Sequence, residues 1–87
     1  MKNEQIEDSR IGVVGIIIED TEKTEDVNKV LHQHSGLVVG RIGIPYPQRK
    51  ICIISLIVDG TSDQISALTG KLGKIDGIQV KSALTKA

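Results

Sequence analysis

The chain has 87 residues, 11 basic and 11 acidic side chains, no formal net charge, and Tyr46 as its only aromatic residue. A chain of this length forms one domain with an aliphatic core, and a neutral chain without aromatic clusters lacks the usual surfaces for binding nucleic acid. No apolar run is long enough to span a membrane, the N-terminus lacks a signal-peptide pattern, and the single Cys52 cannot form an intramolecular disulfide, so we expect a cytoplasmic protein.

The first half of the chain predicts a strand, a helix and a second strand. Residues 10–19 form a short apolar run rich in β-branched side chains, which is typical of a buried strand. Asp20 can cap the start of the following helix, and Gly36 suits the left-handed position at its end. Residues 37–44 are expected to form the second strand.

The second half predicts a hairpin, a helix and a last strand. Residues 45–49 contain two prolines, which cannot donate to a strand ladder, so we expect a loop there. Residues 50–59 form the most hydrophobic strand of the chain. Thr61 and Gln64 have the spacing of a capping box at the start of the second helix. Alternating apolar residues then predict a strand at residues 78–84.

This order of elements defines the expected fold class. A strand–helix–strand–strand–helix–strand order is typical of the ferredoxin-like βαββαβ sandwich, an α+β fold. Right-handed crossovers place both helices on one face of a four-stranded antiparallel sheet. We therefore expect a single domain over residues 10–86, preceded by a polar segment at residues 1–9 that is disordered or frayed.

The two most hydrophobic strands carry apolar side chains on both of their faces. Because helices cover one face only, the other face should be polar in a monomer. In the third strand it instead carries Ile51, Ile53 and Ile57. We expect these residues to form the interface of a homo-oligomer, a dimer or a tetramer, in which a second copy covers the sheet.

Candidate catalytic and metal-binding groups are scarce. No Cys–His, Ser–His–Asp or paired-carboxylate pattern appears at a meaningful spacing, so we expect no enzymatic activity. His32 and His34 are two residues apart on a helix and face different directions. We expect no metal site, and a site shared by His34 and Cys52 of different subunits is the alternative. The sequence does not identify a cofactor.

Two short segments are candidates for binding a small ligand between subunits. The turn of Glu19, Asp20 and Thr21 precedes a helix start with unpaired N–H groups. In the second strand, glycines allow close approach and an arginine offers a directional contact for an anion. These strand residues are Gly40, Arg41 and Gly43. Helix capping by Asp20 and protection of a sheet edge by the arginine are the alternative explanations.

Four segments of the chain, residues 40–45, 53–58, 65–73 and 77–81, resemble those of the iron-only hydrogenase system regulators. The resemblance extends over residues 10–86. That family is similar to ACT-type regulatory domains and to the C-terminal domain of the nickel-responsive repressor. The resemblance implies a non-enzymatic regulatory or ligand-sensing module of an iron-only hydrogenase system. The alternative is a purely structural protein–protein interaction module without a small-molecule ligand.

Overall fold

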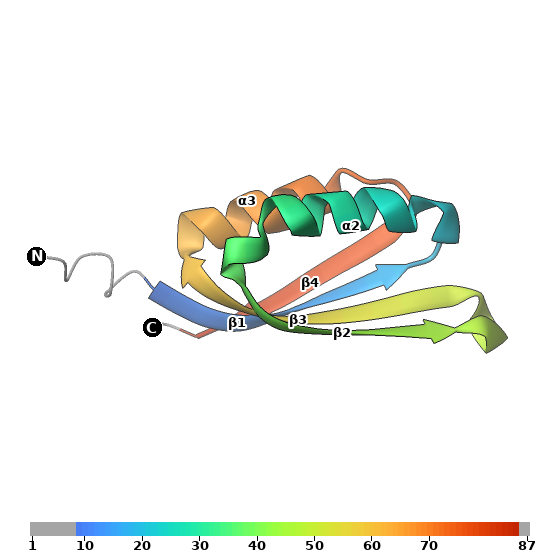
Figure 1. The fold of residues 1–87 in the computed structure, drawn as a ribbon, viewed down its shortest axis with the longest axis horizontal. Helices are drawn as coiled ribbons and strands as arrows, with labels where there is room; N and C mark the ends of the chain where they lie inside the picture. The colour runs from blue at the N-terminus through green and yellow to red at the C-terminus, as the bar shows by residue number, and fades with distance from the viewer. Residues whose placement is uncertain (1–8, 86–87) are drawn as a thin grey trace, which may run out of the picture.

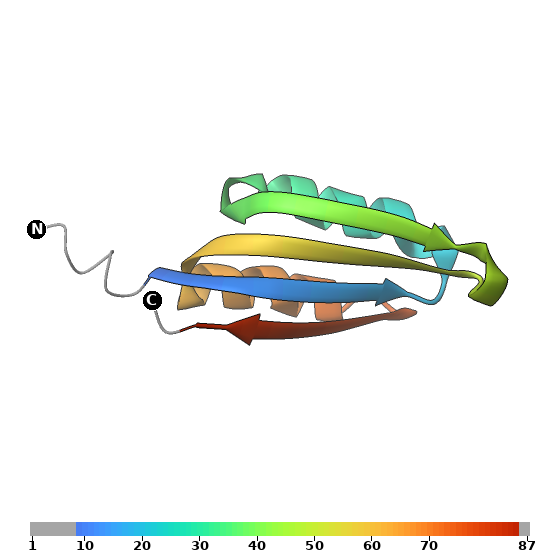
Figure 2. The ribbon, with the colours of Figure 1, turned by 90° about the horizontal axis from the view of Figure 1, so that it is seen from below.

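The computed structural model describes residues 9–85, which form a four-stranded antiparallel sheet in the order β2-β3-β1-β4 (Figures 1 and 2). The strands are β1 (Ser9–Ile18), β2 (Val38–Tyr46), β3 (Ile51–Thr61) and β4 (Ile78–Leu84). Two helices, α2 (Thr24–Gln33) and α3 (Ser62–Gly73), lie on the same face of the sheet. Short 3₁₀ turns complete the chain: η1 (Thr21–Lys23), η2 (Ser35–Leu37) and η3 (Pro47–Arg49). The predicted α+β ferredoxin-like fold is confirmed.

The core lies between the helices and the sheet. Alternate residues of the central strands β1 and β3 point toward the helices, because successive side chains of a strand face opposite sides. All of the core side chains are at most 3% exposed. They are Val14, Ile16, Ile18, Ile54, Leu56 and Val58 from the sheet, and Val27, Leu31, Ile65, Leu68 and Leu72 from the helices.

The predicted cap is confirmed at the start of α3, whereas the N-cap residue of α2 is Lys23, without a side-chain hydrogen bond. The Thr61 hydroxyl accepts a hydrogen bond from the Gln64 backbone N–H (3.1 Å), and the Gln64 side-chain oxygen accepts from the Thr61 N–H (2.9 Å). The Asp20 carboxylate accepts from the Glu22 N–H at 3.0 Å, although it caps the 3₁₀ turn η1 rather than α2 directly. The capping box satisfies two backbone groups that would otherwise lack partners at the start of α3.

Two local predictions are wrong. Pro45 and Tyr46 belong to β2, and only η3 connects β2 to β3. An edge strand has backbone groups on its solvent side that need no partner, so a proline fits there. Gly36 does not adopt the left-handed conformation, because α2 ends at Gln33 and the chain continues into η2. Among residues 9–85, positive φ angles occur at Lys50 (58°) and Gly77 (83°).

The predicted disordered segment falls largely outside the described residues. Residues 1–8, 86 and 87 are not among them, whereas Ser9 begins β1 and its hydroxyl donates to Asp59 at 3.0 Å. The observed β3 extends two residues beyond its predicted end, to Thr61, and β4 has the predicted bounds.

Candidate functional site

The sheet face opposite the helices is aliphatic and exposed. Figure 2 looks onto this face, with the helices behind the strands. Eight large apolar side chains on it are 38–64% exposed. They are Ile11, Val13, Ile17, Ile42, Ile44, Tyr46, Ile53 and Ile57, and we call this surface the open face. The predicted interface residues Ile53 and Ile57 belong to it, and the half-buried Ile51 lies on the same side of β3.

The open face has two apolar rows separated by small side chains. One row runs across the sheet through Ile44, Ile53 and Ile17, and a second pairs Ile57 with Val13. Between them, Ser55 pairs with Gly15 at the centre of the face, and Ile42 lies beside Ser55 on the edge strand β2. Among residues 9–85, the charged side chains that the strands place on this side of the sheet are Asp59 and Lys81, and Lys81 pairs with Gly15 from the edge strand β4. The centre of the face is therefore uncharged and apolar.

The Glu19–Thr21 turn has structural partners. The N–H groups of Glu19 and Asp20 both donate to the carbonyl oxygen of Gly77, at 2.8 and 3.0 Å. The Glu19 carboxylate accepts from the Gln79 side-chain amide at 3.1 Å. These bonds join the end of β1 to the start of β4, so the conformation of the turn is explained without a ligand.

The two predicted ligand-binding segments do not meet within one chain. Arg41 lies opposite Leu56 in β3. The end of β1, Ile18, lies on the other side of β3 and pairs with Cys52, which precedes Leu56 by four residues. Arg41 and Gly43 face the helix side of β2, and Gly40 faces the open side. A ligand site that joins both segments requires a second subunit, and it remains a prediction.

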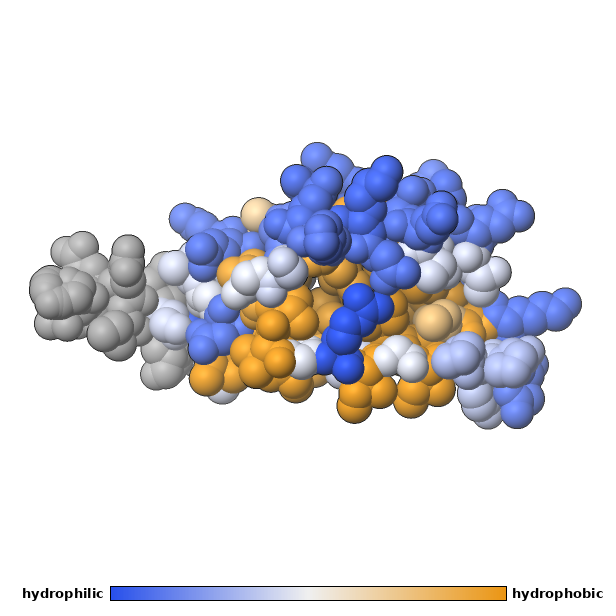
Figure 3. Space-filling model, viewed as in Figure 1, coloured by the Kyte–Doolittle hydropathy of each residue, from blue (hydrophilic) through white to orange (hydrophobic). Residues whose placement is uncertain are grey.

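Arg41 does line a cleft between α2 and the edge strand β2. The cleft has a volume of about 300 Å³, and the Arg41 guanidinium donates to the Asn28 side-chain oxygen at 3.0 Å. The polar lining is completed by His32 and Ser35, and the floor consists of Leu31, Val38 and Leu56. Figure 3 shows this side of the molecule, with hydrophilic side chains over the helices and an apolar band along the sheet below.

Of the other three polar residues of this cleft, only His32 was considered from the sequence, and then as a metal ligand. Asn28, His32 and Ser35 are spaced by four and then three residues, which places them on one side of a helix and its continuation. This spacing is the sequence signal that could have grouped the three residues. It could not be linked to Arg41 without knowing which side of α2 faces β2.

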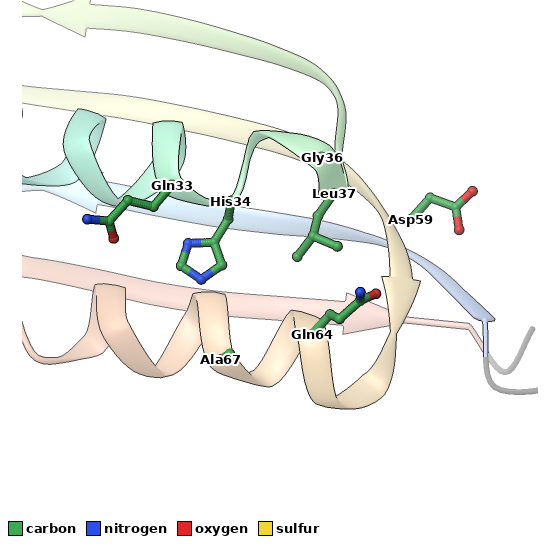
Figure 4. Close-up of a pocket in the computed structure, with 7 residues that line it drawn as sticks. All are labelled: Gln33, His34, Gly36, Leu37, Asp59, Gln64 and Ala67. Atoms are coloured by element: carbon green, nitrogen blue, oxygen red, sulfur yellow. The ribbon is translucent and has the colours of Figure 1, made fainter. Parts of the chain in front are cut away.

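A second cavity, of about 430 Å³, lies between the end of α2 and the start of α3 (Figure 4). His34 points from α2 toward α3, and Leu37 fills the space beside it. The His34 Nδ1 atom lies 2.9 Å from the Val30 carbonyl oxygen, which can only accept, so this nitrogen carries the proton. His34 is therefore bonded to its own helix, and the Gln64 oxygen in the cavity wall is occupied by the capping box.

Residues 9–85 contain no group of three His, Cys, Asp or Glu side chains placed to hold a metal ion. Within one chain, His34 and Cys52 lie near opposite ends of β3, since the His34 cavity is also lined by Asp59.

In the described part of the chain, no helix is long and apolar enough to cross a membrane.

The arrangement defines a ferredoxin-like α+β domain with one uncovered sheet face. Residues 10–82 match the model of the TM1266-like family. The description of this family is "Iron-only hydrogenase system regulator, putative". The chain belongs to this family. A solved structure of the uncharacterised protein TM1266 from Thermotoga maritima is 38% identical, with a TM-score of 0.85, and the match covers 90% of this chain and 99% of that one.

More distant structures share only the fold. The C-terminal domain of the MgtC protein from Mycobacterium tuberculosis is 15% identical, with a TM-score of 0.69 and 92% of each chain covered. The apo form of CPII, a nitrogen regulatory PII-like protein from Thiomonas intermedia K12, is 13% identical, with a TM-score of 0.54. That match covers 87% of this chain and 91% of CPII. No curated protein matches the chain.

Proposed function

We propose that this protein is a non-enzymatic regulatory module of an iron-only hydrogenase system and that it acts as a homo-oligomer assembled through the open face. The family supplies the regulatory role. The observation that carries the proposal is the exposed aliphatic sheet opposite the helices. The lone Cys52, which has no partner for an intramolecular disulfide, is in keeping with action in the cytoplasm.

The size of the open face supports an interface. Eight apolar side chains at 38–64% exposure present on the order of 600 Å² of apolar surface, at the top of the range for the largest patch on a monomer. A standard protein–protein interface buries about 800 Å² per partner, so the open face alone would supply most of such an interface. Leaving such a surface in water would be costly for a small domain.

A second copy is the partner that the face fits best. Its centre is uncharged, and its two apolar rows flank the small residues Ser55 and Gly15, so two such faces can interdigitate in a sheet-on-sheet packing. A two-fold contact uses the same patch on both subunits. The neutral charge of the whole chain imposes no strong repulsion between copies.

The proposed mode of action is through binding rather than catalysis. Arg41, His32 and Ser35 gather in the α2–β2 cleft without a nucleophile–base hydrogen bond between any of them among the described residues. We propose that the module acts on other proteins and does not itself bind nucleic acid, because the central strands carry no aromatic residue. A salt-sensitive shift of duplex DNA or RNA by the isolated protein would contradict this part.

Sedimentation velocity tests the assembly. The wild-type chain is expected to sediment as a dimer or tetramer at micromolar concentration. Ile57→Lys or Ile53→Lys should shift it to monomer or aggregate, because an unpaired charge would be forced into an apolar contact. Ser66→Lys, which adds the same charge on the exposed surface of α3, is the matched control and should leave the size unchanged.

A wild-type monomer, or lysine variants with unchanged sedimentation, would contradict the proposal. We also propose that the module senses a small ligand, which thermal denaturation tests separately, since a ligand that binds only the folded state raises its stability. An oligomer that no small molecule stabilises would favour the purely structural alternative.

A further inference from the structure

We propose that the cleft between α2 and β2 binds a small organic carboxylate with a short aliphatic chain. The inference adds a ligand to the proposed regulatory function, but it does not depend on the oligomer, because the cleft lies on the helix side of the sheet. It assigns roles to Asn28, His32, Ser35 and Arg41.

The polar groups of the cleft favour an anion. Its lining residues include the Arg41 guanidinium, the His32 imidazole and the Ser35 hydroxyl, and none of them is acidic. The cavity between α2 and α3 differs in this respect, because Asp59 is part of its lining. An arginine offers paired N–H donors whose spacing matches the two oxygens of a carboxylate, so the headgroup can be recognised by geometry as well as charge.

Arg41 has one side-chain partner in the cleft, although both side chains of the pair are exposed. Its Nη2 donates to the Asn28 oxygen across the cleft at 3.0 Å, and the remaining guanidinium donors make no hydrogen bond among residues 9–85. A side chain already fixed by a neighbour loses less conformational entropy on binding. The Arg41–Asn28 pair therefore positions the donors that the carboxylate would meet.

The floor and side of the cleft favour an aliphatic chain on the ligand. Leu31 and Leu56 form an apolar floor and are themselves part of the core. Gly43 follows Arg41 on the same side of β2, and a Cβ there would meet only the Ile54 Cγ1 atom, at 3.9 Å. Gly43 therefore leaves space beside Arg41, although it does not line the cleft itself, and the cleft volume of about 300 Å³ suits a small molecule.

Titration of the ¹⁵N-labelled full chain with sodium butyrate, followed by NMR, tests the site. Butyrate is expected to shift the signals of Asn28, His32, Ser35 and Arg41. The dissociation constant should be in the millimolar range, because a ligand with so few atoms gains little binding free energy. Butyramide, its neutral counterpart, should shift them far less. Inorganic phosphate, which has the charge without the chain, should also bind more weakly.

Variants of Arg41 distinguish recognition of the carboxylate from protection of the sheet edge. Arg41→Ala should weaken butyrate binding about tenfold or more, and Arg41→Lys should also weaken it, because lysine keeps the charge and loses the paired donors. If Arg41 only protected the edge, Arg41→Lys would behave as the wild type. Arg49→Ala, the same change in η3, is the control and should bind normally.

Several outcomes would overturn the inference. They are an absence of shifts, shifts outside the cleft, equal responses to butyrate and butyramide or to butyrate and phosphate, and unchanged binding by Arg41→Ala. The Ile57→Lys monomer should bind butyrate as the wild type does, so a failure of the oligomer proposal and a failure of this site give different results.

Discussion

The two faces of the sheet are built from almost the same residue types and have opposite surroundings. In β3, Leu56 is fully buried beneath the helices, while its neighbour Ile57 is 41% exposed on the open face. Hydrophobicity does not distinguish them; the strand alternation and the one-sided helix layer do. One face therefore stabilises the monomer, whereas the other is available to stabilise an assembly.

The largest expected effect comes from truncating the covered face. Leu56→Ala should lower the free energy of unfolding by about 2–5 kcal/mol, because it removes fully buried methyl groups and leaves a cavity. Urea denaturation monitored by circular dichroism measures the change. For a small domain this loss can approach the whole stability.

The matched change on the open face is Ile57→Ala. It should cost the isolated monomer less than about 1 kcal/mol, yet weaken self-association measured by sedimentation equilibrium. Equal losses of monomer stability for the two variants would show that the faces do not differ in the way described.

A glycine pair in β1 gives the next largest difference. Gly12 lies on the covered side, where a Cβ would approach the Leu84 Cδ2 atom at 2.2 Å and the Ala83 carbonyl oxygen at 2.6 Å. Gly12→Ala should therefore destabilise the fold by about 1–3 kcal/mol, since a backbone atom cannot easily move aside. Thermal denaturation at matched protein concentration measures the loss.

On the open side, a Cβ at Gly15 would meet only the Lys81 carbonyl oxygen, at 3.9 Å. Gly15→Ala should leave the monomer as stable as the wild type or stabilise it by up to about 1 kcal/mol, because alanine restricts the unfolded chain. A loss as large as that of Gly12→Ala would contradict the assignment of the two glycines to different surroundings.

The helix layer can also be weakened without touching the open face. Thr61→Ala removes the hydroxyl that caps α3 and should cost about 1 kcal/mol. Chemical denaturation gives the magnitude, and sedimentation should show unchanged assembly at temperatures where the variant is folded. Dissociation of the folded variant would mean that the helix layer takes part in the interface.

The smallest expected effect is a gain in stability. Gly70 lies within α3, and a Cβ there would meet nothing within 4 Å. Gly70→Ala should stabilise the fold by about 0.5–1 kcal/mol through helix propensity alone. A destabilised variant would indicate that α3 contacts a partner at this position.

Much of the fold could be predicted because local signals and the global topology agree. The apolar runs marked the central strands, and the Thr61–Gln64 spacing marked the start of α3. The errors at Pro45 and Gly36 have a common origin. Both residues were interpreted by their usual local roles, but an edge position accommodates the proline and a following 3₁₀ turn removes the need for a left-handed cap.

The candidate sites were less accessible to sequence reasoning. The open face followed from strand alternation, which places Ile53 and Ile57 on one side by counting alone. The cleft required knowing that Asn28 on α2 faces Arg41 on β2, a contact between residues 13 apart in sequence. Rotation of a helix about its axis over a sheet is set by packing of the whole core, which single-residue patterns do not specify.

Pro45 in the edge strand β2 also limits how copies of this chain can join. Its ring nitrogen carries no proton, so a foreign strand laid along β2 would meet a gap in the row of donors. The register shift between Val38 and Gly40 interrupts the same strand near its other end. Open-ended growth of fibres along this edge is thereby disfavoured, so any assembly of the chain would have to use another surface.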